Sequence, residues 1–357
     1  MFNLINEGII PYISGLWTLP WLLIGLIVTI LVARVTGRDK IDTLMKKIGL
    51  IILYFFVPVL IFRIFLNTPF GEDEINFSIL VSAIILFMYL LAYGYAKYLV
   101  KHQKMKGKTK DLFIKTMLTN QGRSSAFIGS MMLAIGPLMV YAAIFMALVG
   151  IALFAIIPFL LSHLHKKESK SKEKETVNPL PWYLRLYPWY LIFFVISGII
   201  VQLITAQKSS ELLGLEADTL LRLYTAITIP AALYYVGAGI HPNDLKKSEL
   251  RKLIGIDKEK KEVDHWNWVR KIFLLTVIIT PILITIIFGS LYILSLLPAT
   301  WFAVIIINAF LPITSTNMFL LAYGIDKKTT AHAVTWTTLV CIPIVVALIM
   351  ISGVYFS

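Results

Sequence analysis

Long apolar runs alternate with short charged connections along the whole chain. A membrane-spanning helix needs about 20 mostly apolar residues. Runs of that kind predict spans at residues 14–33, 48–67, 78–100, 113–136, 138–162, 188–206, 219–240, 271–295, 299–323 and 330–355. The pattern therefore predicts an all-α membrane protein with ten transmembrane helices, called helices one to ten in this subsection. The 58% of hydrophobic residues and the mean hydropathy of +0.80 agree with it.

Positive charge marks one side of the predicted membrane protein. The connections after the odd-numbered helices hold 29 of the 33 Lys and Arg, at 34–47, 97–115, 166–185, 246–271 and 327–328. The opposite connections carry the acidic run GEDE at 71–74 and Glu211, Glu216 and Asp218. Because basic loops stay in the cytoplasm, we expect a multi-pass cell-membrane protein with both termini extracytoplasmic.

The same placement changes what the net charge of +13 implies. The cations are spread over five loops, so they favour contact with anionic membrane lipid over a nucleic-acid partner. Cys341 is the single cysteine, and no Cys or His cluster has metal-ligand spacing, so no metal or cofactor is expected. No P-loop, carboxylate pair or His–Cys arrangement predicts an enzyme.

The apolar-free run KKESKSKEKE at 166–175 divides the chain into two halves of five helices. We expect a first repeat at 1–163, a charged cytoplasmic linker at 164–187 and a second repeat at 188–357. An odd number of helices in each half makes the repeat inverted. The LAIG that ends at Gly136 in the first half matches the LAYG that ends at Gly324 in the second.

Helices four and nine are each interrupted midway by helix-breaking and small polar residues. The segments read NQGRSSAFIG from residue 120 and NAFLPITSTN from residue 308. Gly122 and Pro312 are the expected breaks, and Pro58 and Pro230 are expected to break helices two and seven. Caps for the second half-helices are expected from Ser124, Ser125, Thr314 and Ser315. Paired interrupted helices predict a transporter's substrate site, and their exposed N–H groups suit an anion.

Two arginines are candidates for binding such an anion. Arg123 lies within the helix-four break, and no Asp or Glu lies within any of the ten spans to neutralise it. Its guanidinium is therefore expected to hold a substrate carboxylate in a two-point hydrogen bond. The alternative is that helix four begins later and Arg123 extends to the cytoplasmic face. For Arg63, five residues beyond Pro58, extension to the outer face and substrate contact both stay open.

Four neutral amides flank the two breaks. They are Asn120 and Gln121 in helix four, and Asn308 and Asn317 in helix nine. The spacing that matches Gly136 with Gly324 also matches Asn120 with Asn308. Each amide could contact the substrate or instead join helices to one another, and the sequence does not choose between these roles.

YFFVPVLIF in helix two, IPAALYYVGAGI in helix seven and NAFLPITSTNMFLLAYGID in helix nine carry a resemblance over nearly the whole chain. The sequence resembles the auxin efflux carrier family, which includes plant PIN-type carriers and prokaryotic permeases. The resemblance implies crossed helices four and nine, a homodimer, and elevator-like movement of helices 3–5 and 8–10 against a scaffold of helices 1, 2, 6 and 7. It maps the family's crossover residues onto Asn120, Asn308 and Pro312, whereas GRSS replaces the expected proline in helix four.

These observations together favour a secondary transporter of a small organic anion, which would bind at the crossing of helices four and nine. An anion channel is the nearest alternative, because polar residues at this depth could also line a continuous pore. A membrane receptor or sensor built on the same fold would bind the anion without transporting it.

Overall fold

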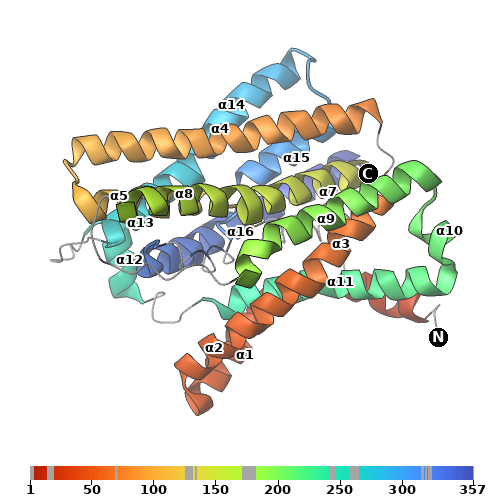
Figure 1. The fold of residues 1–357 in the computed structure, drawn as a ribbon, viewed down its shortest axis with the longest axis horizontal. Coiled ribbons are helices and arrows are strands. Elements are labelled where there is room, and N and C mark those ends of the chain that lie inside the picture. Colours follow the sequence, from red (N-terminus) through yellow and green to blue (C-terminus); the bar gives the residue numbers. More distant parts are fainter. Residues whose placement is uncertain are drawn as a thin grey trace.

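The computed structural model describes residues 4–13, 20–68, 71–124, 132, 135–170, 182–240, 246–256, 265–314, 317, 320 and 324–356 (Figure 1). These residues form helices and their connections, and the described part of each of the ten predicted ranges contains helix. The one departure among them is an isolated antiparallel bridge between Arg123 and Ile313. An all-α architecture follows from the long apolar runs of the sequence.

The N-terminal half begins with two short turns and continues as long helices. Its elements are η1 Leu4–Ile9, η2 Ile10–Ile13, α1 Pro20–Thr36, α2 Arg38–Ile51, η4 Ile52–Phe56, α3 Val57–Leu66, α4 Glu72–His102, α5 Gly107–Thr119, α7 Gly136–Ile151, η5 Ala152–Ile156 and α8 Ile157–Lys170. The pairs α2–α3 and α7–α8 are each joined through a π-helical turn, so each pair is one continuous helix.

The C-terminal half has a related succession of elements. They are α9 Trp182–Thr205, α10 Ser209–Leu213, α11 Leu215–Ala238, α12 Lys247–Ile254, α13 His265–Phe273, η7 Leu274–Ile279, α14 Thr280–Ile293, α15 Ala299–Ala309 and α16 Lys327–Phe356. The π-helical turn η7 joins α13 to α14. In each half, therefore, a shorter helix, α5 or α15, stops well before the predicted span ends.

Among the residues that the structure describes, four continuous helices are long and apolar enough to cross a membrane, at Thr43–Leu66, Glu72–His102, His265–Ile293 and Lys327–Phe356. Large apolar side chains cover the outside, such as Leu23, Ile27 and Leu31 of α1. Many threonines, in contrast, are buried within the bundle, such as Thr116, Thr276 and Thr337. Apolar residues outside and polar residues inside are typical of a helical membrane protein, because lipid surrounds it.

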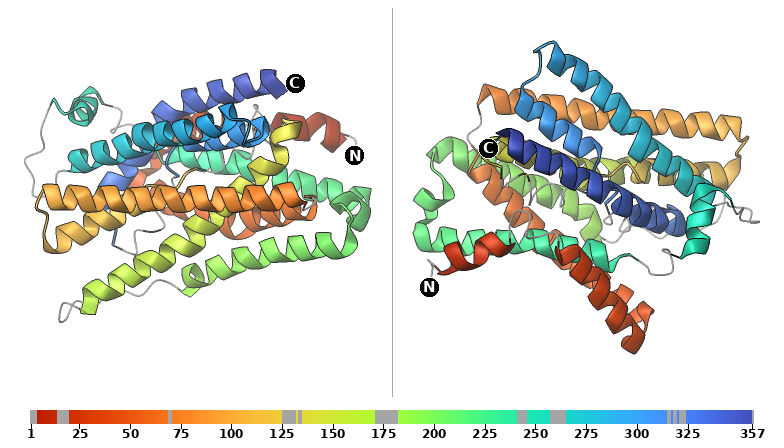
Figure 2. Two further views of the ribbon diagram at one scale, coloured as in Figure 1. Left: turned by 90° about the horizontal axis from the view of Figure 1, so that it is seen from above. Right: turned by 180° about the vertical axis from the view of Figure 1, so that it is seen from behind.

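The helices form two groups by their packing. In the first, α1 packs along α11 and α3 along α9. Gly25 of α1 lies directly against the backbone of Tyr234 in α11, and Gly198 of α9 lies against the backbone of Phe62 in α3. The second group contains α4, α5, α7, α13, α14, α15 and α16. Figure 1 and the right-hand view of Figure 2 show α1 and α2 projecting from the rest of the bundle.

The prolines in the second helix of each half do not interrupt it, contrary to expectation. Pro230 lies inside the continuous helix α11. Pro58 lies in the first turn of α3, directly after the π-helical turn η4. A proline is tolerated in the first turn of a helical segment, because the N–H that it lacks would have no acceptor within that segment. The wider π turn before Pro58 accommodates its ring.

Candidate functional site

Two backbone segments cross and pair where α5 and α15 end. Ser124 N donates to Pro312 O at 2.8 Å, and Thr314 N donates to Gly122 O at 3.0 Å. These two bonds create the antiparallel bridge between Arg123 and Ile313. Each broken helix thus satisfies part of the other's backbone, which a break surrounded by apolar helices requires. The two helices end near the predicted breaks at Gly122 and Pro312, α5 at Thr119 and α15 at Ala309.

The asparagines that precede the two crossing segments make the same hydrogen bond. Asn120 Nδ2 donates to Thr116 O at 2.8 Å, and Asn308 Nδ2 donates to Val304 O at 2.6 Å. The two donors, and likewise the two acceptors, are equivalent positions under the sequence spacing that matches Asn120 with Asn308. Asn120 Nδ2 also reaches Thr330 Oγ1 of α16 at 3.2 Å. Each amide therefore caps the last turn of its helix.

Arg123 lies in the interior, with 3% of its surface exposed, so the alternative of extension to the cytoplasmic face is wrong. Its Nη1 donates to Leu311 O at 3.0 Å, and its Nη2 donates to Thr276 O at 2.9 Å. The structure thus supplies two backbone partners that the sequence analysis did not anticipate. Arg123 Nε has no hydrogen-bond partner among the described residues.

The carbonyl of Thr276 is available to Arg123 because of a proline. In the π-helical turn η7, Thr280 N donates to Leu275 O, five residues back. The next donor in that register would be residue 281, whose acceptor would be Thr276 O. Residue 281 is proline and has no N–H, so it cannot make this bond. The motif Thr-x₄-Pro is the sequence signal, but nothing in it indicates Arg123 as the partner.

Several buried polar atoms around the crossing lack hydrogen-bond partners among the residues that the structure describes. They are Asn120 Oδ1, Asn308 Oδ1, Thr119 Oγ1, Ser124 Oγ and both amide atoms of Gln121 and Asn317. All six residues are at most 2% exposed. Unpaired buried polar groups are rare and costly, so such a concentration is typical of a site that a ligand or water completes.

Gly122 allows the two crossing segments to approach closely. A Cβ at this position would lie 2.6 Å from Leu153 Cδ1 and 2.8 Å from Asn317 Oδ1. Any larger residue would therefore displace the Asn317 amide. Thr314 is buried at the second crossing segment, whereas Ser125 and Ser315, the other two expected caps, lie outside the described residues.

A small cavity adjoins the crossing. It has a volume of about 10 Å³ and is lined by Gln121 and Arg123 together with side chains of α4, α7 and η5, among them Tyr89. That volume is about what one water molecule needs. An organic anion does not fit, so the site is closed in this conformation.

Arg63 lies in a separate polar cluster between α3 and α11. Its Nη1 donates to Thr225 Oγ1 at 2.8 Å, and its guanidinium interacts electrostatically with Asp218. Asp218 is 1% exposed and accepts hydrogen bonds from Ser209 Oγ and from Arg222 Nε, the latter at 2.6 Å. The sequence analysis placed Asp218 in a loop because helix seven was predicted to start at 219. The spacing of Asp218 and Arg222, one helical turn apart, was the signal it missed.

A second cluster that the sequence analysis missed joins three elements at the basic end of the bundle. Asp326 Oδ1 lies 3.0 Å from His265 Nδ1 and accepts a bond from Thr329 N at 2.7 Å. Asp326 N donates to Thr116 Oγ1 of α5 at 2.9 Å. Asp326 therefore caps α16 and ties it to α5 and α13.

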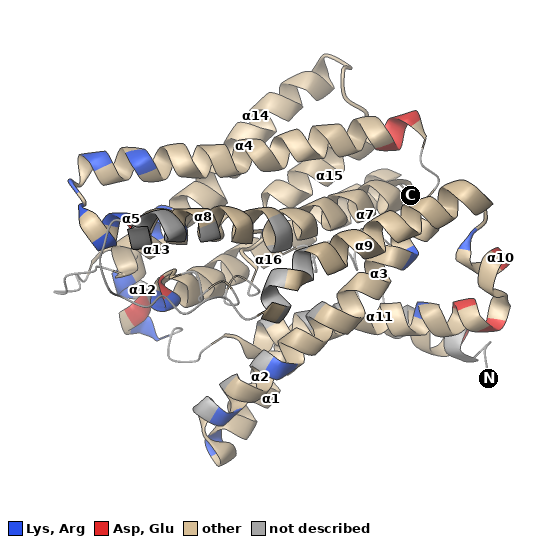
Figure 3. Ribbon diagram, viewed as in Figure 1, with Lys and Arg blue, Asp and Glu red and all other residues tan. Residues whose placement is uncertain are grey.

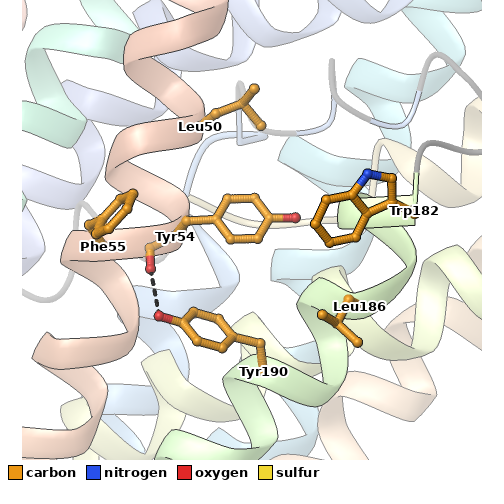
Figure 4. Close-up of a pocket in the computed structure, with 6 residues that line it drawn as sticks. All are labelled: Leu50, Tyr54, Phe55, Trp182, Leu186 and Tyr190. Atoms are coloured by element: carbon orange, nitrogen blue, oxygen red, sulfur yellow. Dashed lines mark hydrogen bonds between the residues drawn. The ribbon is translucent and has the colours of Figure 1, made fainter.

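A larger cavity lies away from the crossing, between α2–η4 and α9. It has a volume of about 480 Å³ and is lined by Leu50, Tyr54, Phe55, Trp182, Leu186 and Tyr190 (Figure 4). Tyr190 Oη donates to Tyr54 O at 3.1 Å. This nearly apolar lining suits a hydrocarbon chain, and it offers no cation to an organic anion. The crossing therefore remains the better candidate site.

Neither the comparison with models of known protein families nor the search of curated protein sequences found a match to this chain.

Proposed function

We propose that this protein is a secondary transporter of a small organic anion, which binds at the crossing between α5 and α15. The observation that carries the proposal is the crossing itself. It combines two interrupted helices, a buried guanidinium and a concentration of unpartnered polar atoms within one buried region. Interrupted helices that meet in pairs are the substrate sites of many secondary transporters.

The sign of the substrate follows from the charge at the crossing. Arg123 is buried and hydrogen-bonded to neutral carbonyls, which leave its charge in place. Ion pairs lie elsewhere in the described part of the chain, for example at Arg222–Asp218 and Lys252–Glu249. An unneutralised cation in a low-dielectric interior attracts an anion strongly. Arg123 Nε and the amides of Gln121 and Asn317 would then hold the substrate.

The proposed architecture is ten spanning helices in a five-plus-five inverted repeat. At the crossing, the spacing that matches Asn120 with Asn308 also matches Ser124 with Pro312, which are themselves joined by a hydrogen bond. It relates the hydrogen bonds of the two asparagines as well. Residues that the repeat matches with one another are expected to be in contact where the twofold axis that relates the two halves passes. Ser124 thus stands at the position that Pro312 holds in the second half.

The first packing group supports the same repeat at a slightly shorter spacing. Gly25 contacts the backbone of Tyr234, and Gly198 contacts the backbone of Phe62. Pro230 precedes Tyr234 by four residues, and Pro58 precedes Phe62 by the same number. Each contact therefore joins a glycine to the turn that follows an equivalent proline. The helices α1 and α11 would therefore pair in the same way as α9 and α3.

The two packing groups correspond to the scaffold and transport domain that the resemblance to the auxin efflux carrier family implies. The scaffold would contain α1, α2–α3, α9 and α11. Where the groups meet, Ile61 and Phe65 of α3 pack with Ala147 of α7 in an apolar cluster. Such an apolar contact suits an elevator-like displacement. The homodimer is likewise an expectation from the resemblance.

The charge distribution supports an orientation with both termini outside the cell. Lys and Arg gather at one end of the bundle, around α5, α12 and α13, whereas the acidic starts of α4 and α11 lie at the other (Figure 3). To test this orientation, Cys341 is replaced and single cysteines are introduced at Asp73 and Ser171. We expect Ser171→Cys to react only from the cytoplasm and Asp73→Cys only from outside. Reaction of both from outside would exclude an inverted repeat.

The function is tested with the purified protein and a panel of small carboxylates. A bound anion should raise the thermal unfolding midpoint in proportion to the logarithm of its concentration. The same anion should then enter proteoliposomes saturably and exchange across the membrane in counterflow. Unitary currents would instead identify an anion channel, and binding without flux would identify a receptor. No response to any organic anion, in either assay, would refute the proposal.

A further inference from the structure

We propose that Arg123 is a built-in cation that takes the place of a coupling ion at the crossing, so that the transporter works without sodium. This inference rests on the proposed transport function and adds the mode of ion coupling to it. It starts from the two carbonyl oxygens that the guanidinium binds, those of Leu311 and Thr276.

One of these carbonyls is released from helical bonding by a break, and the other by a proline within a continuous helix. Leu311 O follows the end of α15 at Ala309. Thr276 O loses its partner in the π register because residue 281 is proline. In transporters with broken helices, carbonyl oxygens of this kind coordinate the Na⁺ that drives transport. The crossing therefore contains the acceptor groups of an alkali-cation site.

In this protein the guanidinium already satisfies those acceptors. Its Nη atoms lie 3.0 Å and 2.9 Å from the two oxygens, which are normal lengths for charged hydrogen bonds. The cavity beside Arg123, about 10 Å³, has no carboxylate among its described lining residues to hold a second cation. A second positive charge next to Arg123 would also be repelled strongly in the interior. The site therefore carries one permanent positive charge and does not recruit another.

The consequence for transport is a fixed coupling between charge and substrate. An organic monoanion would neutralise Arg123 when it binds, and no alkali cation would bind with it. The loaded site would then carry no net charge contributed by Arg123 and the anion, whereas the empty site would remain cationic. Sodium gradients should consequently have no direct effect on uptake.

The first test uses the unaltered protein in lipid nanodiscs. Its thermal unfolding midpoint is measured in Na⁺, K⁺ and choline chloride at equal ionic strength. We expect the three midpoints to agree within about 1 °C, since a ligand that does not bind the folded state does not stabilise it. A saturable rise in Na⁺ alone would overturn the inference, because it would reveal a sodium site in the presence of Arg123.

The second test removes the built-in cation. We expect Arg123→Ala to lower the midpoint by roughly 5–10 °C, because two buried carbonyls lose their partners. Millimolar ethylguanidinium, or Na⁺ itself, should restore part of that loss saturably. Arg123→Lys keeps the charge, so its midpoint should not respond to either cation. Absence of any cation response in Arg123→Ala would contradict the inference.

Gly122→Ala is the matched control. It disturbs the same crossing, because its Cβ would press on Leu153 and Asn317, yet it keeps Arg123. Its lowered midpoint should therefore not be restored by ethylguanidinium or Na⁺. If it is, the rescue is a general salt effect and the inference fails. All these measurements are made without substrate, so their outcome is independent of the anion-binding and uptake assays that test the proposed function.

Discussion

The two arginines inside the helical bundle, Arg63 and Arg123, are stabilised in different ways. Arg63 lies near the buried carboxylate of Asp218, whose other partners include Arg222. Arg123 has only carbonyl partners among the described residues. Carbonyl dipoles hold a guanidinium in position but leave its charge, whereas a nearby carboxylate offsets part of that charge. A buried cation is therefore a candidate for ligand binding when hydrogen bonds within its own chain fix its position but no carboxylate balances its charge.

The largest expected effect separates the two arginines by anion affinity. Arg123→Ala should weaken binding of the anion identified in the panel by about 100-fold, the size expected when a buried charge loses its partner. Arg63→Ala should change affinity less than threefold, because Arg63 already interacts with Asp218. The measurement is a calorimetric titration at a temperature below the unfolding midpoints of both variants. Equal losses in the two variants would remove the distinction between the arginines.

The next effect concerns stability in the Arg63 cluster. Asp218→Asn should lower the free energy of unfolding by about 1.5–3 kcal/mol, since the carboxylate that accepts hydrogen bonds from Ser209 and Arg222 loses its charge. The double variant Asp218→Asn with Arg63→Ala should cost less than the sum of the single changes, because the two residues share one network. Chemical unfolding in detergent measures both. Strict additivity would mean that Arg63 and Asp218 do not interact.

The contrast between the arginines also marks what the sequence could predict. The breaks near Gly122 and Pro312 were predictable because proline and glycine act on the helix that contains them. The partners of Arg123 were not, since they are backbone atoms far away in the sequence, at Thr276 and Leu311. Asp218 was predicted to lie one residue before the start of helix seven, whereas it lies inside α11, because hydropathy alone locates helix ends poorly. For Pro58 and Pro230 the local rule was wrong, because π-helical and continuous α-helical packing accommodate both rings.

A smaller effect tests whether the two halves share one packing. Gly25→Ala and Gly198→Ala each direct a Cβ against the backbone of the partner helix. Overpacking of this kind costs about 1–3 kcal/mol. If the scaffold follows an inverted repeat, the two variants should be destabilised to a similar degree. Gly94→Ala is the control, because nothing lies near its Cβ position and only helix propensity changes there.

The smallest effect compares the two asparagines of the crossing. Asn120→Ala and Asn308→Ala each remove one bond to the carbonyl four residues earlier, and each should lower the free energy of unfolding by about 1 kcal/mol. Asn120→Ala should cost slightly more, because Asn120 also bonds to Thr330. In Asn120→Ala with Thr330→Val, that excess should disappear, since the hydroxyl that loses its donor is absent too.

Anion affinity distinguishes a capping role from a binding role in the same variants. A fall of about tenfold or more in both would assign the two unpartnered Oδ1 atoms, which accept hydrogen bonds, to a hydroxyl or N–H donor of the substrate, since about 1.4 kcal/mol is a typical hydrogen bond within a closed site. Unchanged affinity would leave both residues as helix caps and confine the site to Arg123, Gln121 and Asn317.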